Sequence, residues 1–135
     1  MTMAELRIKA KVENLNDVMA FVDAELEKLD CPMRAQMQID VAVEELFVNI
    51  AHYAYAPGEG DAQITVRAAD GMVEIEFRDS GVPYDPLAKA DPDVSLSAEE
   101  RQIGGLGIFM VKKTMDDMVY HYMDGQNVFK IRKKL

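Results

Sequence analysis

The sequence predicts an α+β fold, a two-layer sandwich with helices on one face of a mostly antiparallel, mixed sheet. Three observations lead to this prediction: a strand-like alternation near the N-terminus, two helical repeats after it, and two pairs of short strands separated by a loop and a further helix. Elements in this order favour packed layers around one core. Because 135 residues is an ordinary length for one domain, we expect residues 1–135 to form a single domain.

The N-terminal part of the chain predicts one strand and two helices. Residues Leu6–Val12 alternate between apolar and polar, which is the period of a half-buried strand. Asn14 offers a helix cap, and apolar residues at helical spacing then continue to about Leu29. Residues 30–32 break this helix, and a second helix is expected from Pro32 to about Tyr53.

The remainder predicts two hairpins, with a long loop and a helix between them. Residues 79–107 contain three prolines among glycine, aspartate and serine, and a helix is expected over 108–115. A loop of this length in so small a domain is usually functional. The expected strands are 63–67, 73–78, 118–123 and 128–132, with turns at Asp70-Gly71 and Asp124-Gly125.

Composition and charge argue against several classes of function. The net charge of −9 would repel a phosphate backbone, so we expect no nucleic-acid partner and interpret the C-terminal basic residues as a solvated strand edge and tail. No apolar run could span a membrane, the N-terminus lacks a secretory signal, and Cys31 is the single cysteine. These features predict a cytoplasmic protein that binds no membrane. The ten methionines are interpreted mostly as core filler.

Two polar residues interrupt an apolar part of the second expected helix. Glu45 and Asn49 are four residues apart, so their side chains lie one above the other on the same face. A carboxylate and an amide oxygen placed this way can hold Mg²⁺ and a neighbouring water or hydroxyl. The alternative is an ordinary solvated helix face, although the apolar neighbours would make an unpaired Glu or Asn costly to bury.

An aspartate and a glycine follow directly after an expected strand. Asp79 could accept a hydrogen bond from an amino group, while Gly81 would let the backbone approach a flat ring closely. The alternative is a tight turn stabilised by an Asx-type hydrogen bond.

A glycine-rich stretch precedes the last expected helix. In Gly104-Gly105-Leu106-Gly107, backbone N–H groups can converge at the positive end of the helix dipole, which suits phosphate oxygens. The stretch is neither a Walker loop, which needs Gly-Lys-Ser or Gly-Lys-Thr, nor the dinucleotide-binding pattern that follows a strand.

Taken together, these three segments resemble the N box, the D-x-G box and the glycine-rich box of the GHKL superfamily, whose ATP-binding domain has the Bergerat fold. The strings Asp79-x-Gly81-x-Pro83-Tyr84-Asp85-Pro86 and Gly104-Gly105-Leu106-Gly107-Ile108-Phe109 are similar to those of the RsbW-type anti-sigma-factor serine kinases. The resemblance covers nearly the whole chain, and it rests on the joint order of the boxes more than on any single box.

The resemblance implies a role for each matching residue. Glu45 would be the general base, and Asn49 would bind Mg²⁺ through its amide oxygen. Asp79 would accept a hydrogen bond from the adenine amino group, which Gly81 would allow to approach. Residues 84–103 would form a lid over ATP. The other implied nucleotide contacts are Gly104, Gly105, Leu106 and Gly107 at the phosphates and Asn127 near the adenine.

The resemblance also implies a function. The chain would be an ATP- and Mg²⁺-dependent serine kinase that phosphorylates a STAS-type anti-anti-sigma protein, sequesters a sigma factor in its other state, and forms a homodimer. Two alternatives are a regulatory module that binds ATP or ADP without phosphoryl transfer, and an acidic scaffold without nucleotide. Many relatives carry His four residues after the metal-binding Asn, whereas this chain has Tyr53 there and His52 one residue earlier. The role of His52 is therefore left open.

Overall fold

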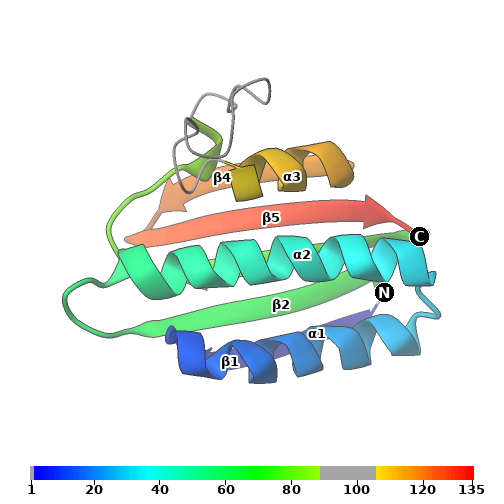
Figure 1. Ribbon diagram of the computed structural model, residues 1–135, viewed down its shortest axis with the longest axis horizontal. Helices are drawn as coiled ribbons and strands as arrows, with labels where there is room; N and C mark the ends of the chain where they lie inside the picture. The colour runs from blue at the N-terminus through cyan, green and yellow to red at the C-terminus, as the bar shows by residue number, and fades with distance from the viewer. Residues whose placement is uncertain (1, 89–105) are drawn as a thin grey trace.

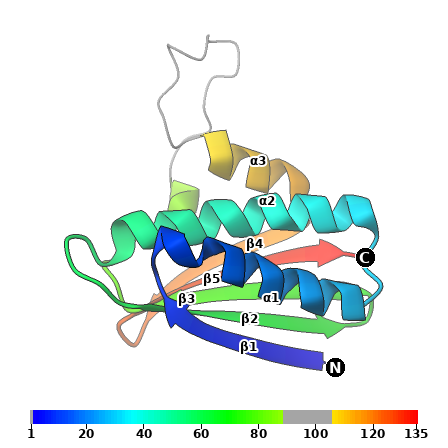
Figure 2. The same ribbon diagram turned by 60° about the horizontal axis from the view of Figure 1, so that its bottom comes forward.

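The computed structural model describes residues 2–88 and 106–135. Its elements are, in chain order, β1 (Thr2–Lys9), a 3₁₀ turn (Val12–Asn14), α1 (Leu15–Lys28), α2 (Met33–Asn49), a π-helical turn (Ile50–Ala54), β2 (Asp61–Ala69), β3 (Met72–Asp79), a 3₁₀ turn (Pro86–Ala88), α3 (Leu106–Thr114), β4 (Asp117–Met123) and β5 (Gln126–Lys134). The helices cover one face of a five-stranded sheet, which confirms the two-layer α+β prediction (Figure 1). A second view shows α1 and α2 side by side over the sheet, with α3 next to α2 (Figure 2). Within residues 2–88 and 106–135, no helix has both the length and the apolar character needed to cross a bilayer.

The sheet has the strand order β1-β2-β3-β5-β4, and every ladder between its described strands is antiparallel. Both predicted hairpin turns are confirmed: Asp70-Gly71 has φ values of 55° and 76°, and Asp124-Gly125 has 54° and 76°. Positive φ at both central residues matches the twist of hairpin strands, and aspartate and glycine tolerate it. The central strand β3 ends at Asp79, directly opposite Asn127 of β5.

The first strand lies earlier in the chain than predicted. β1 covers Thr2–Lys9 rather than Leu6–Val12, because its partner β2 begins at Asp61, which is opposite Lys9. Beyond that point β1 has no strand to pair with, and the chain turns into a 3₁₀ helix. Asn14 occupies the N-cap position of α1, but its amide donates to the Lys9 carbonyl (2.9 Å) and makes no cap hydrogen bond.

A cluster of buried side chains fills the space between the sheet and the helices. Alternate strand residues and helix residues three or four apart contribute to it, as the two periods predict. Phe47 of α2 and Phe77 of β3 are among its largest members and are at most 1% exposed. Met115 belongs to this cluster, but the core-filler interpretation is wrong for five methionines that are exposed. They are Met3, Met33, Met37, Met110 and Met123.

The other face of the sheet carries paired charges. Glu76 of β3 is 2% exposed and lies beside three cations, Arg67, Arg78 and Lys130. Burial alone would raise the pKa of Glu76, but the hydrogen bond and charge of Arg78, followed by the other two cations, lower it below its ordinary value. Because Lys130 belongs to β5, an internal strand, the interpretation of the C-terminal basic residues as a strand edge is wrong for this residue.

Two carboxyl groups face each other between α1 and α2. The Oδ1 atoms of Asp23 and Asp40 are both buried, and while both groups are ionised neither oxygen has a hydrogen-bond donor among the described residues; a proton on Asp40 supplies one. Burial, then the hydrogen bond with Asp23 and repulsion by its charge, raise the pKa of Asp40 to about 7. The folded chain therefore binds a proton at pH values where the unfolded chain has released it. This contribution to stability is complete at acidic pH and is lost as the pH rises through about 7.

We expect Asp40→Asn to flatten this pH dependence, because an amide can still donate a hydrogen bond to Asp23 but carries no charge. Between pH 5.5 and 8 the melting temperature of the unmodified chain should fall more than that of the variant. At pH 8 the variant should be more stable by about 1 kcal/mol, a figure reduced for solvent screening. The control is Glu27→Gln, on the exposed part of α1. Identical pH profiles for Asp40→Asn and the unmodified chain would contradict the assignment.

Candidate functional site

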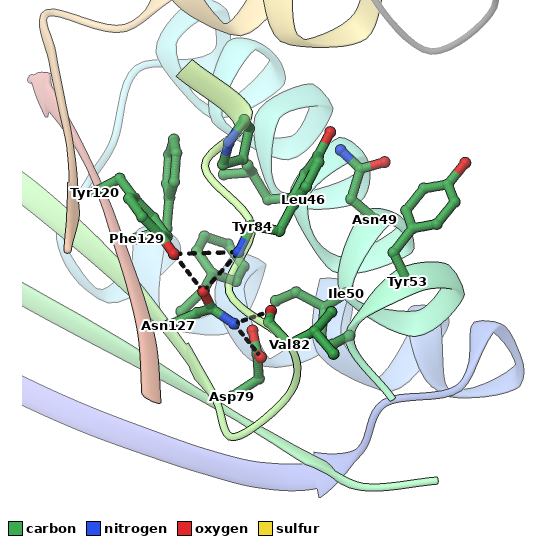
Figure 3. A pocket seen from close by; sticks show the side chains of 13 residues that line it. Leu46, Asn49, Ile50, Tyr53, Asp79, Val82, Tyr84, Tyr120, Asn127 and Phe129 are labelled. Atoms are coloured by element: carbon green, nitrogen blue, oxygen red, sulfur yellow. Dashed lines mark hydrogen bonds between the residues drawn. The ribbon is translucent and has the colours of Figure 1, made fainter. Parts of the chain in front are cut away.

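A cavity lies between the C-terminal end of α2 and the ends of β3, β4 and β5 (Figure 3). Its walls are mostly apolar and aromatic, and Asp79 and Asn127 supply buried polar groups. The lining residues are Leu46, Asn49, Ile50, Tyr53, Ala54, Phe77, Asp79, Val82, Tyr84, Pro86, Tyr120, Asn127 and Phe129. Asn49 and Asp79 thus share one cavity, although they come from different layers of the sandwich.

One oxygen of the Asp79 carboxylate accepts two hydrogen bonds, whereas the other accepts none from the described residues. Its side chain is 5% exposed, and Oδ1 accepts hydrogen bonds from the Gly81 N–H and from Asn127 Nδ2, both at 2.9 Å. The bond to Gly81 is the Asx-type turn that the sequence allowed as an alternative. The hydrogen bonds of the described residues do not use Oδ2. The turn therefore leaves the second oxygen of this carboxylate available to a donor on a ligand.

Asn127 orients Asp79 and the turn after it. Its Nδ2 donates to Asp79 Oδ1 (2.9 Å) and to the Val82 carbonyl (2.8 Å), while its Oδ1 accepts from the Tyr84 N–H (3.1 Å) and the Tyr120 hydroxyl. Both donors and both acceptor positions of the amide are therefore used within the protein. A direct contact between Asn127 and adenine stays a prediction; the observed contacts are those of a residue that positions Asp79.

Gly81 lets the 79–84 turn lie directly on the end of the π-helical turn that follows α2. The Val82 N–H donates to the Ala54 carbonyl (2.9 Å), and a Cβ atom at Gly81 would overlap that same carbonyl group. Ala54 ends the π-helical turn that continues α2, a form of helix often found at functional sites. The expected helix to about Tyr53 is thus present, with its last turn widened. A close approach of Gly81 to a ligand ring stays a prediction.

Tyr55 is a structural residue of the site that the sequence analysis missed. Its hydroxyl donates to the Asp61 carbonyl (2.6 Å) and accepts from the Ser80 N–H (2.7 Å), so it ties the start of β2 to the turn after Asp79. Burial is the main cause that raises the pKa of this phenol. A Cβ atom at Gly60 would overlap the Tyr55 ring, so this glycine makes room for the contact. Neither contact follows a local sequence pattern that could have predicted it.

Glu45 and Asn49 lie on one face of α2, as their spacing predicts. Asn49 Nδ2 is 3.4 Å from Glu45 Oε1, which leaves the Asn49 carbonyl oxygen outside this contact. The Glu45 carboxylate also lies against Gly107 in the first turn of α3, where a Cβ atom would overlap it. The N-terminal end of a helix favours a negative charge. The structure thus brings together Glu45, Asn49 and Gly107, which are far apart in the sequence.

Only some of the remaining predicted site and lid residues lie among the residues that the structure describes. Gly104, Gly105 and residues 89–103 of the expected lid lie outside the described residues, and Leu106 begins α3. The start of the lid segment, Tyr84, lines the cavity, and its ring centroid is 6.3 Å from that of Tyr53. His52 is exposed, contacts Tyr53 edge-on and is not among the residues that line the cavity.

The residues present fit a nucleotide with Mg²⁺. Asp79 lines a mostly apolar cavity and has one carboxylate oxygen that no described residue bonds, a combination suited to a flat base with an amino group. The described residues contain no group of three His, Cys, Asp or Glu side chains that could hold a metal ion alone. Mg²⁺ usually binds through one or two protein oxygens together with waters and phosphates, and Glu45 and Asn49 provide such oxygens.

The two-layer fold and the apolar cavity with its buried aspartate agree with a nucleotide-binding domain. The chain belongs to the family of histidine kinase-like ATPase domains, because the model of that family matches residues 8–133. This membership confirms the resemblance to the GHKL superfamily that the three boxes indicate, and it implies ATP binding at the family level.

Several relatives are named as serine kinases. The chain is 32% identical to the serine-protein kinase RsbW of Listeria monocytogenes, in an alignment that covers 67% of this chain and 60% of the relative. It is 28% identical to the serine/threonine-protein kinase BtrW of Bordetella bronchiseptica, over 70% of this chain and 67% of the relative. It is 25% identical to the RsbW of Bacillus cereus, over 92% of this chain and 80% of the relative.

A solved structure has the same fold. The structure of the RsbU and RsbW domains of Rv1364c from Mycobacterium tuberculosis matches with a TM-score of 0.72 at 15% identity, covering 100% of this chain and 33% of that one. At this identity the match concerns the fold, and it agrees with the two-layer architecture described above.

We expect Gly81→Ala to destabilise the domain, because the added methyl group must push the 79–84 turn away from the Ala54 carbonyl. The loss should be about 1–3 kcal/mol in the free energy of unfolding, measured by denaturant titration. Ser80→Ala, at the exposed neighbouring position of the same turn, serves as the control. Unfolding of Gly81→Ala at the same denaturant concentration as the unmodified chain would show that this contact is not tight.

Proposed function

We propose that this chain is an ATP-dependent protein serine kinase and partner-switching regulator. It would transfer the γ-phosphate of ATP to a serine of a STAS-type anti-anti-sigma protein and sequester a sigma factor in its other state. The observation that carries the proposal is the position of Glu45, one helical turn from Asn49 and against the first turn of α3. The names of the relatives as serine kinases support it. The homodimer that the resemblance implies belongs to the same proposal.

In this proposal, the two ends of the site have different tasks. Asp79 Oδ2 would accept a hydrogen bond from the adenine amino group, and the apolar cavity walls would cover the ring. Asn49 would offer its amide oxygen to Mg²⁺, which supplies positive charge beside the phosphates. Gly107 would offer its backbone at the N-terminal end of α3 to phosphate oxygens, as Gly104 and Gly105 would before it.

Glu45 would act on the phosphoacceptor. Its carboxylate would orient the serine hydroxyl of the bound protein and take the proton as the oxygen attacks the γ-phosphorus. The new bond joins the serine oxygen to phosphorus, and the bond from the γ-phosphorus to the leaving ADP oxygen breaks. Asn49 would hold the carboxylate in position through the contact between Nδ2 and Oε1.

A second candidate function is a regulatory module that binds ATP or ADP without phosphoryl transfer. The observation that favours it is the contact between Asn49 Nδ2 and Glu45 Oε1 (3.4 Å), because one oxygen of the carboxylate then already accepts a hydrogen bond within the protein. In that case, the nucleotide would only select partners, and replacement of Glu45 would leave regulation intact.

Nucleotide binding is expected to depend on Asp79. In a thermal shift assay with Mg-ADP, a ligand at one hundred times its dissociation constant should add about 2.7 kcal/mol of stability to the unmodified chain. Asp79→Asn should abolish most of this shift, because an amide nitrogen cannot accept the hydrogen bond from adenine. The matched control is Asp30→Asn, at an exposed turn position that tolerates asparagine. A full shift in Asp79→Asn would remove Asp79 from the adenine site.

Phosphoryl transfer is expected to depend on Glu45. Glu45→Gln keeps the size of the side chain and removes its basicity, so transfer from radiolabelled ATP to STAS-type proteins of the same genome should slow by at least about 100-fold. The Mg-ADP thermal shift of this variant should remain, and Glu27→Gln on exposed α1 should transfer normally. If the unmodified chain binds nucleotide but phosphorylates none of these proteins, the regulatory module is the better description.

A further inference from the structure

An apolar stripe runs along the outer side of α2 and continues onto α3. It consists of Met33, Met37, Val41 and Val48 of α2 and Met110 of α3, and we call it the methionine face. Met33 is 79% exposed, Met37 63%, Val41 53% and Met110 45%. Because the α2 members are four or seven residues apart, they share one side of the helix. That side points away from the core, which α2 contacts through Ile39, Val43 and Phe47.

The methionine face leads to the candidate catalytic carboxylate. Val41, Val48 and Met110 line a groove between α2 and α3, together with Glu44, Glu45 and Gly107. Met33 lies twelve residues before Glu45, which corresponds to roughly 18 Å along the helix axis. Whatever fills the groove therefore touches Glu45, and the apolar stripe extends this contact toward the N-terminal end of α2.

The exposure of these side chains needs a reason beyond folding. A contiguous apolar patch on a domain surface marks an interaction site more often than chance exposure does. Methionine suits such a surface, because its flexible thioether side chain adapts to different partner shapes. The exposed Glu44 lies between Val41 and Val48 on the same side of α2 and adds a negative charge to the groove, on a chain whose net charge is −9.

We propose that the methionine face is the docking surface for the phosphoacceptor protein, an inference that rests on the proposed kinase function. The partner presents an apolar patch next to its serine and a basic residue that meets Glu44. Docking along α2 brings the serine hydroxyl to the groove that contains Glu45. A second copy of this chain on the same face would cover Glu45 and compete with the acceptor.

The test measures binding and transfer separately. Met37→Glu and Val41→Glu place a charge in the stripe at exposed positions, so the fold should tolerate them. The probes are purified STAS-type proteins of the same genome, titrated by calorimetry in the presence of Mg-ADP and assayed for phosphorylation with ATP. The matched control is Met3→Glu, a methionine that is 56% exposed on β1, away from the groove. Met37→Leu is the conservative variant.

We expect Met37→Glu and Val41→Glu to weaken binding of the STAS-type protein by at least about tenfold and to raise KM by the same factor. The turnover number at saturation and the Mg-ADP thermal shift should stay unchanged, and Met3→Glu and Met37→Leu should behave as the unmodified chain does. A STAS-type protein could bind without being phosphorylated, and Met37→Glu could still weaken that binding. This result would refute the kinase function and support the docking surface.

Three results would overturn the docking proposal. The first is equal binding of the STAS-type proteins by Met37→Glu, Met3→Glu and the unmodified chain. The second is that none of the STAS-type proteins binds the unmodified chain in the presence of Mg-ADP or Mg-ATP. The third is self-association that Met37→Glu abolishes while partner binding persists, measured by light scattering, which would assign the face to a second copy of this chain.

Discussion

The hydrogen bond from Asn127 to Asp79 joins the last residue of the central strand to the neighbouring strand, and the geometry of the site depends on it. Both side chains are buried, and the antiparallel register of β3 and β5 puts them opposite each other. A buried carboxylate without partners would be costly, so the bonds to Oδ1 make the position of Asp79 possible. The same asparagine also binds the backbone at Val82 and Tyr84, so one amide positions both Asp79 and the segment that follows it.

Two glycines, Gly81 and Gly107, pack closely on α2 and the turn that follows it, and they complete the site there. At its C-terminal end, Gly81 packs on the Ala54 carbonyl, which closes one wall of the cavity. At the start of α3, Gly107 packs on the Glu45 carboxylate. In both places, the absence of a side chain is what allows a segment from after β3 to reach the helix. The glycines of this family's boxes thus serve the packing of the protein as well as the ligand contacts proposed for them.

The charges and apolar groups outside the core are divided between the two sides of the sandwich. The open face of the sheet carries ion pairs centred on Glu76, which is buried among three cations. The helical side carries the methionine face beside Glu45 and a carboxyl pair between α1 and α2. The first arrangement satisfies its charges within the chain. The second leaves apolar area exposed beside the half-buried Glu45, which is the arrangement expected of a surface that meets another protein.

The sequence by itself determined the class of fold and most of the helices and hairpins, because apolar periods of 2 and 3.6 and the two Asp-Gly turns are local signals. It also selected Glu45, Asn49, Asp79 and Gly81, whose types and order match the family's boxes. Only the tertiary structure decided where β1 ends, since that depends on the start of β2, and that Asn127 and Tyr55 support the site from distant strands and turns. It likewise placed several methionines outside the core, because the side of α2 that faces the sheet is fixed by packing against it. Local patterns record what each residue prefers along its own segment, whereas partners across the sheet and between the layers are chosen by the fold as a whole.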